Sequence, residues 1–336
     1  MSSDPVRVGL NGFGRIGRNV FRASLDNDAV EVVGVNDVMD DDEVEYLARY
    51  DTVMGTLEGA GIEDGTLSVE GTDFEAGVFH ETDPAELPWD DLDVDVAFEA
   101  TGLFRNYDDA SKHLAAGADK TVISAPPKGD KPVKQLVYGV NHEEYDGEDV
   151  VSNASCTTNS ITPVAKVLDE EFGIRSGQLT TVHAYTGSQN LLDGPNGKPR
   201  RRRAAAANII PTTTGAAQAA TEILPQLEGK LDGMAIRVPV PNGSITEFVC
   251  DLDADVTEGD VNAAFREAAA GDLEGVLGVT DEDLVSTDIL GDAYSTQVDL
   301  PNTNVVNGLT KILTWYDNEY GFANRMLDVA EYVDGH

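Results

Sequence analysis

One cysteine and one histidine have a spacing that suits nucleophilic chemistry. Cys156 lies in the segment Ser152–Asn159, where an expected strand gives way to an expected helix. The positive end of a helix dipole favours a thiolate at that position. His183 ends another expected strand further along the chain. A thiolate–imidazolium pair is a nucleophile at neutral pH, although a single cysteine and a single histidine are more often structural when nothing else accompanies them.

A glycine motif near the start of the chain is typical of a dinucleotide site. Residues 12–17 read G-x-G-x-x-G, directly after the expected strand Val6–Leu10 and at the start of the expected helix Arg15–Leu25. A second expected strand ends at Asp37, at the distance from the glycines that this type of site requires. The alternative is a glycine turn and a strand-end aspartate without a ligand, which this combined context disfavours.

Each residue of the motif has an expected task. Gly12 would form the tight turn, Gly14 would let the backbone approach the pyrophosphate, and Gly17 would let the helix pack on the sheet. Asp37 would accept hydrogen bonds from the adenosine ribose. Because the neighbouring Val38 offers no cation for a 2′-phosphate, NAD is predicted rather than NADP.

Alternating strands and helices are expected to position these residues. The pattern in the first half predicts an α/β fold, a Rossmann-type doubly wound parallel sheet. Its further strands are expected at 31–36, 94–98, 120–124, 136–140 and 150–152. The second half predicts an α+β domain with a mixed, largely antiparallel sheet. Its strands are expected at 178–184, 234–240, 244–253 and 296–299, and its helices near 157–172, 213–227 and 259–270, with a terminal helix at 321–333.

The charge of the chain excludes several classes of function. The 61 acidic and 23 basic residues give a net charge of −38. Such a surface would repel nucleic acid and anionic membranes, so neither is expected as a partner. The acidic residues are spread along the chain rather than gathered in a tail, which indicates adaptation to a salt-filled cytoplasm. An ordinary acidic protein is the alternative.

The remaining cysteine and histidines point to no further chemistry. Cys250 ends an apolar run and is expected to be a buried core thiol. The five histidines have no metal-ligand spacing, so no metal site is predicted. The start of the chain lacks a secretory signal, and no apolar stretch is long enough to span a bilayer. A cytoplasmic location is therefore expected.

Four segments carry a family resemblance. They are GLNGFGRIGR at 9–18, NASCTTN at 153–159, IIPTTTGAA at 209–217 and WYDNE at 315–319. Together they resemble phosphorylating glyceraldehyde-3-phosphate dehydrogenase of the bacterial and eukaryotic type, in order and over essentially the whole chain. With the acidic composition, the chain resembles a member of that family from a halophile. The distinct archaeal type of this enzyme has a different arrangement around its cysteine.

The resemblance implies an activity. It is the NAD-dependent oxidative phosphorylation of D-glyceraldehyde 3-phosphate to 1,3-bisphosphoglycerate through a cysteine thioester, in glycolysis or gluconeogenesis. Inorganic phosphate is the second substrate, and a homotetramer is implied. The first alternative is erythrose-4-phosphate dehydrogenase, which typically lets water cleave the thioester. The second is a non-catalytic NAD-binding redox sensor that uses Cys156 as a switch.

The resemblance also implies roles for particular residues. Cys156 would be the nucleophile and His183 the base that activates it. The substrate phosphate would contact Thr186 and Arg237, and the attacking phosphate Ser155, Thr157, Arg201, Thr214 and Gly215. The cofactor would be lined by Gly12, Gly14, Arg15, Ile16, Gly17, Asp37, Thr101, Phe104, Ser124 and Asn318, with Asn318 holding the nicotinamide carboxamide.

At one position two arginines are candidates, and at another the chain departs from the family pattern. Arg200 is the alternative to Arg201 within the run of four arginines at 200–203, and Ser188 stands where many bacterial members have an aspartate beside the substrate phosphate. The family fold returns the terminal helix to the first domain. Residues 1–155 and 319–336 are therefore expected to form the NAD-binding domain, and residues 156–318 the catalytic domain.

Overall fold

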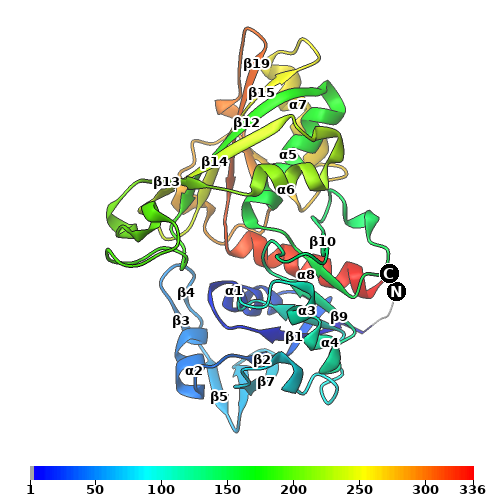
Figure 1. Cartoon of the computed structure of the whole chain (residues 1–336), viewed down its shortest axis with the longest axis vertical. Coiled ribbons are helices and arrows are strands. Elements are labelled where there is room, and N and C mark those ends of the chain that lie inside the picture. The colour runs from blue at the N-terminus through cyan, green and yellow to red at the C-terminus, as the bar shows by residue number, and fades with distance from the viewer. Residues whose placement is uncertain (1–3) are drawn as a thin grey trace. The chain divides into compact units, whose positions relative to one another are not determined.

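Runs of valine predict the central strands of the first sheet, and the computed structural model, which describes residues 4–336, contains them. The chain divides into two units (Figure 1). The first unit runs to Ser155 and includes Ala323–His336, and the second is Cys156–Phe322. The sequence places the return to the first domain at residue 319, whereas the units change at Ala323, inside the terminal helix.

The first unit is built on a 9-stranded sheet in the order β10-β11-β9-β8-β1-β2-β7-β6-β5. Its strands are β1 (Val6–Asn11), β2 (Val30–Asn36), β5 (Ala60–Glu63), β6 (Thr66–Val69), β7 (Glu75–Phe79), β8 (Val96–Glu99), β9 (Lys120–Ile123), β10 (Lys134–Gln135) and β11 (Val150–Ser152). The strands from β10 to β7 pair in parallel, while β5 and β6 pair antiparallel. The order β7-β2-β1-β8-β9-β11 is that of the doubly wound dinucleotide fold, so that prediction is confirmed.

Helices and short elements connect these strands. They are α1 (Arg15–Ser24), α2 (Asp41–Arg49), α3 (Tyr107–Ala110), α4 (Lys112–Ala115), the hairpin β3 (Tyr50–Asp51) and β4 (Gly55–Thr56), and the 3₁₀ turns η1 (Pro84–Glu86) and η2 (His142–Glu144). Asp40 is the N-cap of helix α2; its carboxylate accepts the Glu43 N–H while the Glu43 carboxylate accepts the Asp40 N–H. This capping box satisfies two helix-end donors.

One expected strand of the first unit is wrong. Residues 138–140 form a turn and 136–137 are irregular; the ladder with β11 is made by Lys134–Gln135, and the Leu136 N–H donates one further bond to Ser152 O at 2.8 Å. Gly139 has a positive φ of 78°, and the Asn141 side chain accepts the Val137 N–H. The apolar run is buried at Leu136 and Val137, so its hydrophobicity reflects burial within a turn.

The second unit has an 8-stranded sheet in the order β13-β14-β12-β15-β19-β17-β16, with β18 paired to β19. Its strands are β12 (Ile174–Ala184), β13 (Ile210–Thr213), β14 (Leu231–Val238), β15 (Ser244–Leu252), β16 (Leu277–Thr280), β17 (Thr296–Asp299), β18 (Asn304–Val306) and β19 (Leu309–Tyr316). Only β12–β14 and β16–β17 pair in parallel among the pairs of this sheet. The predicted mixed, largely antiparallel sheet is confirmed.

The helices of the second unit follow the predicted segments closely. They are α5 (Cys156–Phe172), α6 (Ala216–Ile223) and α7 (Glu258–Ala269), with α8 (Tyr320–Asp334) beginning at its end and the 3₁₀ turns η3 (Pro199–Arg202), η4 (Ala205–Ala207), η5 (Pro225–Leu227), η6 (Ser286–Ile289) and η7 (Leu300–Asn302). Helix α5 is mostly buried and contacts β12, β15, β17 and β19. Because the sheet fixes this helix, it also fixes the first residue, Cys156. Within residues 4–336, no helix combines the length and hydrophobicity needed to cross a membrane.

Candidate active site

The cysteine and the histidine that the sequence singles out are neighbours. Cys156 is the first residue of α5, and His183 lies near the end of β12. The distance from Cys156 Sγ to His183 Nε2 is 3.5 Å. Ala154, two residues before the cysteine, is buried with a positive φ of 56°, a conformation that few non-glycine residues adopt. The chain thus turns sharply from β11 into the helix that carries the thiol.

Burial governs the electrostatics of this pair. It raises the pKa of the Cys156 thiol, against the opposing effect of the Arg237 charge. Burial, followed by repulsion from Arg237, lowers the pKa of His183 to about 3. Both shifts favour a neutral thiol beside a neutral imidazole. The helix dipole alone favours the thiolate, but desolvation outweighs it in this environment.

Arg237 and the Ala184 carbonyl orient the imidazole. Arg237 lies opposite His183 in the parallel pairing of β14 with β12, and its Nη1 donates to Ala184 O at 2.7 Å. His183 Nδ1 is 2.8 Å from the same oxygen and 2.9 Å from Arg237 Nη1. With its proton on Nδ1 and directed to Ala184 O, the ring presents the Nε2 lone pair to the thiol, as a general base requires.

Tyr316 is a part of the site that sequence reasoning missed, although it lies within WYDNE. Its hydroxyl is 3.0 Å from Thr157 Oγ1 and 2.8 Å from Thr181 Oγ1, and its ring lies edge-on to His183 at 5.9 Å. Burial, with a further contribution from Cys156, raises the pKa of Tyr316 to about 12. The hydroxyls of Thr157 and Thr181 therefore share hydrogen bonds with a neutral phenol.

Basic and hydroxyl side chains form a second cluster in this unit. Arg201 donates to Ser188 Oγ and to Thr212 Oγ1, both at 3.1 Å, and Thr186 Oγ1 is 2.9 Å from Ser188 Oγ. Arg201 also contributes to lowering the pKa of His183, as does Arg237. Converging guanidinium and hydroxyl donors are suited to bind an anion, and the cluster is notable in a chain of net charge −38. This geometry favours Arg201 over Arg200, whose Nη1 reaches only Pro211 O at 3.5 Å.

Two further predicted phosphate residues lie at the start of α6. Gly215 is its N-cap, and Thr214 Oγ1 accepts the Ala216 N–H at 3.1 Å. Ser155 is the last residue of the first unit.

Asn318 is held in place by Ser244. The Ser244 hydroxyl donates to Asn318 Oδ1 at 2.7 Å and accepts the Ala184 N–H at 3.1 Å. The neighbouring Asp317 is buried and accepts from Asn242 Nδ2 and from the Gly291 N–H. The amide of Asn318 is thereby tied to the strand end that also carries His183.

The glycine motif has the geometry of a diphosphate turn. Gly12 has a positive φ of 103°, and a Cβ there would lie 2.6 Å from Thr101 N. A Cβ on Gly17 would lie 1.9 Å from Gly12 O, whereas one on Gly14 would meet no atom within 4 Å. Gly14 is the N-cap of α1 and has no side chain with which to cap that helix. The residues present therefore fit an anionic dinucleotide, which needs open space and helix N–H groups at this point.

The other predicted cofactor residues lie after the carboxyl ends of the central strands or in α1, except Phe104, which lies in the irregular segment before α3. Asp37 follows β2, and its Oδ2 accepts the Phe13 N–H at 2.7 Å. Ser124 follows β9 and donates its N–H to Glu99 O at 3.0 Å. Thr101 follows β8, and its hydroxyl bonds to the Glu99 carboxylate. Arg15 and Ile16 begin α1, with the Arg15 guanidinium paired to Asp51, and Phe104 lies within contact of Lys112.

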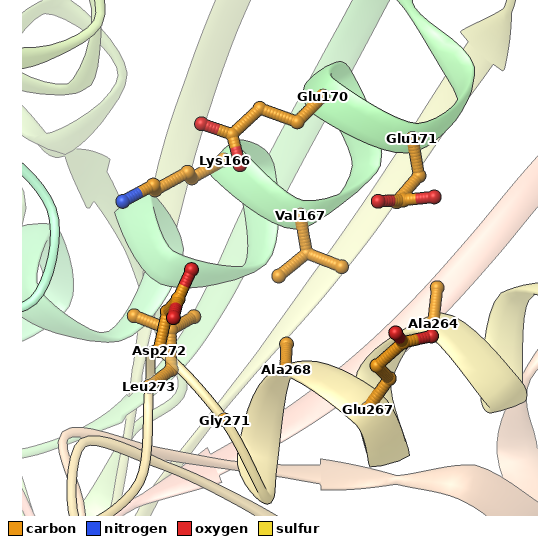
Figure 2. A pocket seen from close by; sticks show the side chains of 10 residues that line it. All are labelled: Lys166, Val167, Glu170, Glu171, Ala264, Glu267, Ala268, Gly271, Asp272 and Leu273. Carbon is orange, nitrogen blue, oxygen red and sulfur yellow. The ribbon is translucent and has the colours of Figure 1, made fainter.

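Two other features lie apart from this chemistry. Cys250 is buried as predicted, and burial raises its pKa to about 12. A cavity of ≈ 260 Å³ lies where α5 and α7 face one another (Figure 2). Figure 2 shows Glu170 and Glu171 on α5 and Glu267 on α7 around it. Nothing there points to a ligand.

Comparison with known proteins gives consistent matches. The family described as "Glyceraldehyde 3-phosphate dehydrogenase, NAD binding domain" matches residues 6–107, and the corresponding C-terminal domain matches residues 155–318. Glyceraldehyde-3-phosphate dehydrogenase of Haloarcula vallismortis is 83% identical over 333 residues, 99% of each chain. The proteins of that name from Streptomyces coelicolor and Geobacillus stearothermophilus are 52% and 49% identical, each over 98% of both chains.

Proposed function

The chain belongs to the glyceraldehyde-3-phosphate dehydrogenase family, and from that premise we propose that it converts D-glyceraldehyde 3-phosphate and inorganic phosphate to 1,3-bisphosphoglycerate, with NAD+ as hydride acceptor. The observation that carries the proposal is the 3.5 Å approach of Cys156 Sγ to His183 Nε2 beside Arg237. A nucleophile, a base and an anion-binding group lie together there.

In the first half of the reaction, His183 takes the thiol proton as Cys156 Sγ attacks the aldehyde carbon. The proton then passes to the new alkoxide and gives a hemithioacetal. His183 removes that hydroxyl proton as the carbon–hydrogen bond breaks, and a thioester on Cys156 remains. Bound NAD+ supplies the acceptor for the hydride. His183 is unprotonated at neutral pH and can therefore accept a proton, but its lowered pKa makes it a weak base until a bound substrate phosphate offsets the Arg237 charge.

In the second half, a phosphate oxygen attacks the thioester carbonyl carbon and the carbon–sulfur bond breaks. Cys156 leaves as a thiolate and recovers a proton from His183. Each phosphate needs its own donors. The substrate phosphate is assigned to Thr186 and Arg237, and the attacking phosphate to Ser155, Thr157, Arg201, Thr214 and Gly215. The contacts of Arg201 with Ser188, and of Ser188 with Thr186, support linked anion sites.

The cofactor is assigned to residues of the first unit, and Asn318 is assigned to the nicotinamide carboxamide. Gly12, Gly14 and Gly17 provide the diphosphate turn, and Asp37 accepts from the ribose. The open space at Gly14 supports this assignment. Arg15, Ile16, Thr101, Phe104 and Ser124 complete the proposed set. The proposed domains are residues 1–155 with 319–336 for NAD, and residues 156–318 for catalysis.

We also propose a homotetramer in the cytoplasm. Leu191, Leu192 and Ile209 are 70–75% exposed, and Met234 is 40% exposed. Leu191, Leu192 and Ile209 lie on the loop around the arginine run and Met234 lies in β14; exposed apolar side chains of this kind suit a subunit contact. The need for NAD+ and for phosphorylated substrates supports the location.

A steady-state assay tests the proposal. NADH formation from glyceraldehyde 3-phosphate is measured in molar KCl, with and without inorganic phosphate. Phosphate-dependent turnover that is lost in Cys156→Ser is expected, while Cys250→Ser serves as the matched thiol control and keeps its activity. Turnover without phosphate would indicate a hydrolysing enzyme such as erythrose-4-phosphate dehydrogenase, and NAD+ binding without turnover would indicate a sensor.

A further inference from the structure

A chain of buried polar side chains underlies the carboxyl edge of the first sheet. Asn36, Asn11 and Glu99 end the adjacent strands β2, β1 and β8, and His113 and Trp89 continue the chain behind them. Their exposures range from 0% to 3%. Burying this many polar groups costs free energy unless each has a hydrogen-bond partner. We therefore expect the arrangement to serve a function.

Glu99 is the centre of the chain. Its Oε2 accepts from Asn11 Nδ2 at 2.7 Å and lies 3.3 Å from His113 Nε2. Its Oε1 accepts the Thr101 N–H at 2.9 Å and bonds to the Thr101 hydroxyl. Donors on every side match an ionised carboxylate, which only accepts.

Trp89 settles the tautomer of His113. The indole N–H can only donate, and it points at His113 Nδ1 at 3.0 Å. Nδ1 must therefore be the acceptor, which leaves the ring proton on Nε2 to be donated to Glu99. Trp89 thus orients His113, and His113 in turn donates to the Glu99 carboxylate.

The Glu99 carboxylate also contacts residues at the two turns that are proposed to bind the cofactor, the turn after β1 and the turn after β8. Thr101 N, which donates to Glu99, is the atom that a Cβ on Gly12 would approach to 2.6 Å. Asn11, the other partner, directly precedes Gly12, and its Oδ1 accepts from Asn36 Nδ2 at 2.7 Å. One carboxylate thereby sets the position of the turn after β1 and of the turn after β8.

We propose that Glu99 is a positioning residue for NAD+, held in register by His113 and Trp89. It touches no reacting atom in this scheme. It fixes the two turns at the spacing that the diphosphate requires, and so it acts on cofactor affinity and not on hydride transfer. The inference rests on the NAD+ site of the first unit.

His113 gives the sharpest test because it lies behind Glu99, away from the cofactor turns. The NAD+ dissociation constant is measured by calorimetry in molar KCl for wild type, His113→Ala, His113→Gln and Asp299→Asn. Asp299 is a matched control in the second unit, since it is also buried and also receives an indole N–H, from Trp315 at 3.1 Å. KM for NAD+ and kcat are measured in parallel.

H113A is expected to raise Kd and KM for NAD+ about tenfold, the effect of one lost bond to a charged group. kcat at saturating NAD+ is expected to stay within about twofold. H113Q, which can donate to Glu99 and accept from Trp89, should recover most of the affinity. D299N should lower thermal stability without changing Kd. If H113A does not fold, Glu99→Gln is measured with the same expectation.

Unchanged NAD+ affinity in H113A or E99Q would overturn the proposal. So would a loss in H113A matched by D299N or not recovered in H113Q, because either result indicates a general effect on folding. Failure of the wild-type protein to bind NAD+ would contradict the cofactor site itself and is therefore distinguishable.

Discussion

The reactivity of Cys156 depends on a balance between burial and one arginine. Burial raises the thiol pKa, while the Arg237 charge acts in the opposite direction. The same arginine lowers the pKa of His183, together with burial. Arg237 therefore favours proton loss from the thiol while disfavouring proton uptake by the imidazole, and a substrate phosphate bound to Arg237 would weaken both effects.

Replacement of this arginine tests the balance. Arg237→Leu is expected to raise the Cys156 pKa further and to raise the His183 pKa toward its ordinary value. Because only the thiolate is alkylated, the rate of reaction with iodoacetamide rises as pH rises through the thiol pKa. The inflection should lie at higher pH in R237L, and a thiol pKa that is higher by about one lowers the neutral-pH rate about tenfold. Arg266→Leu removes an exposed ion pair with Asp281 and should leave the pH dependence of the alkylation rate unchanged. A pH dependence in R237L identical to that of the wild type would contradict this role of Arg237.

At the scale of elements, the strand–turn–helix unit from β1 to α1 depends on glycines for two different reasons. Gly17 lacks room for a side chain because Gly12 O occupies it, whereas Gly14 faces open space. Protein packing therefore requires glycine at position 17, whereas at position 14 only the proposed contact with the diphosphate would require it.

Two alanine substitutions separate these reasons. Gly17→Ala is expected to destabilise the protein by about 1–3 kcal/mol, as overpacking does, and to weaken NAD+ binding. Gly14→Ala should unfold at the wild-type temperature yet bind NAD+ far more weakly. Thermal unfolding and calorimetric NAD+ titration measure the two effects. Gly61→Ala in β5, also in open space, should change neither. Wild-type NAD+ affinity in G14A would place the diphosphate elsewhere.

The sequence predicts these elements well where local pattern and packing agree. The glycines, the valine strands and the start of α5 at Cys156 all follow from periodicity and turn chemistry. The antiparallel extension β5–β6 and the buried turn at 136–140 do not, because tertiary contacts determine whether an apolar run pairs. The Glu99–His113–Trp89 chain is not predictable from sequence, because its members come from separate elements that only the folded sheet brings together.

At the scale of the whole molecule, 61 carboxylates far outnumber the basic groups available to pair with them. Asp334 in α8 is one example of repulsion between carboxylates. Burial raises its pKa, and the nearby charges of Asp95 and Asp119 raise it further. Screening in molar salt shortens the range of such interactions to about 3 Å. Stability of the fold is therefore expected to depend on salt.

Thermal unfolding in increasing KCl measures that dependence. The unfolding temperature is expected to rise steadily from about 0.1 M to molar KCl, as repulsion is screened. The H. vallismortis relative offers a comparison under the same conditions. Equal unfolding temperatures in dilute and molar KCl would contradict the interpretation of the charge as salt adaptation.

A single carboxylate provides a local version of the same test. A raised pKa means that the ionised form of Asp334 destabilises the folded state at neutral pH. Asp334→Asn should therefore raise the unfolding temperature in dilute buffer, and the gain should shrink in molar KCl as the contribution from Asp95 and Asp119 is screened. Asp281→Asn, which breaks the ion pair with Arg266, should not raise it. Destabilisation by D334N in dilute buffer would contradict the argument.

The most direct test of the central claim is a single turnover without phosphate. Enzyme, NAD+ and glyceraldehyde 3-phosphate are mixed in phosphate-free molar KCl. NADH formation is followed by absorbance, and the mass of the protein is measured on samples quenched with acid. We expect a burst of one NADH per chain, together with an acyl adduct on the peptide that contains Cys156. Added phosphate should remove the adduct and let NADH formation continue. NADH formation without an adduct on Cys156 would contradict this mechanism.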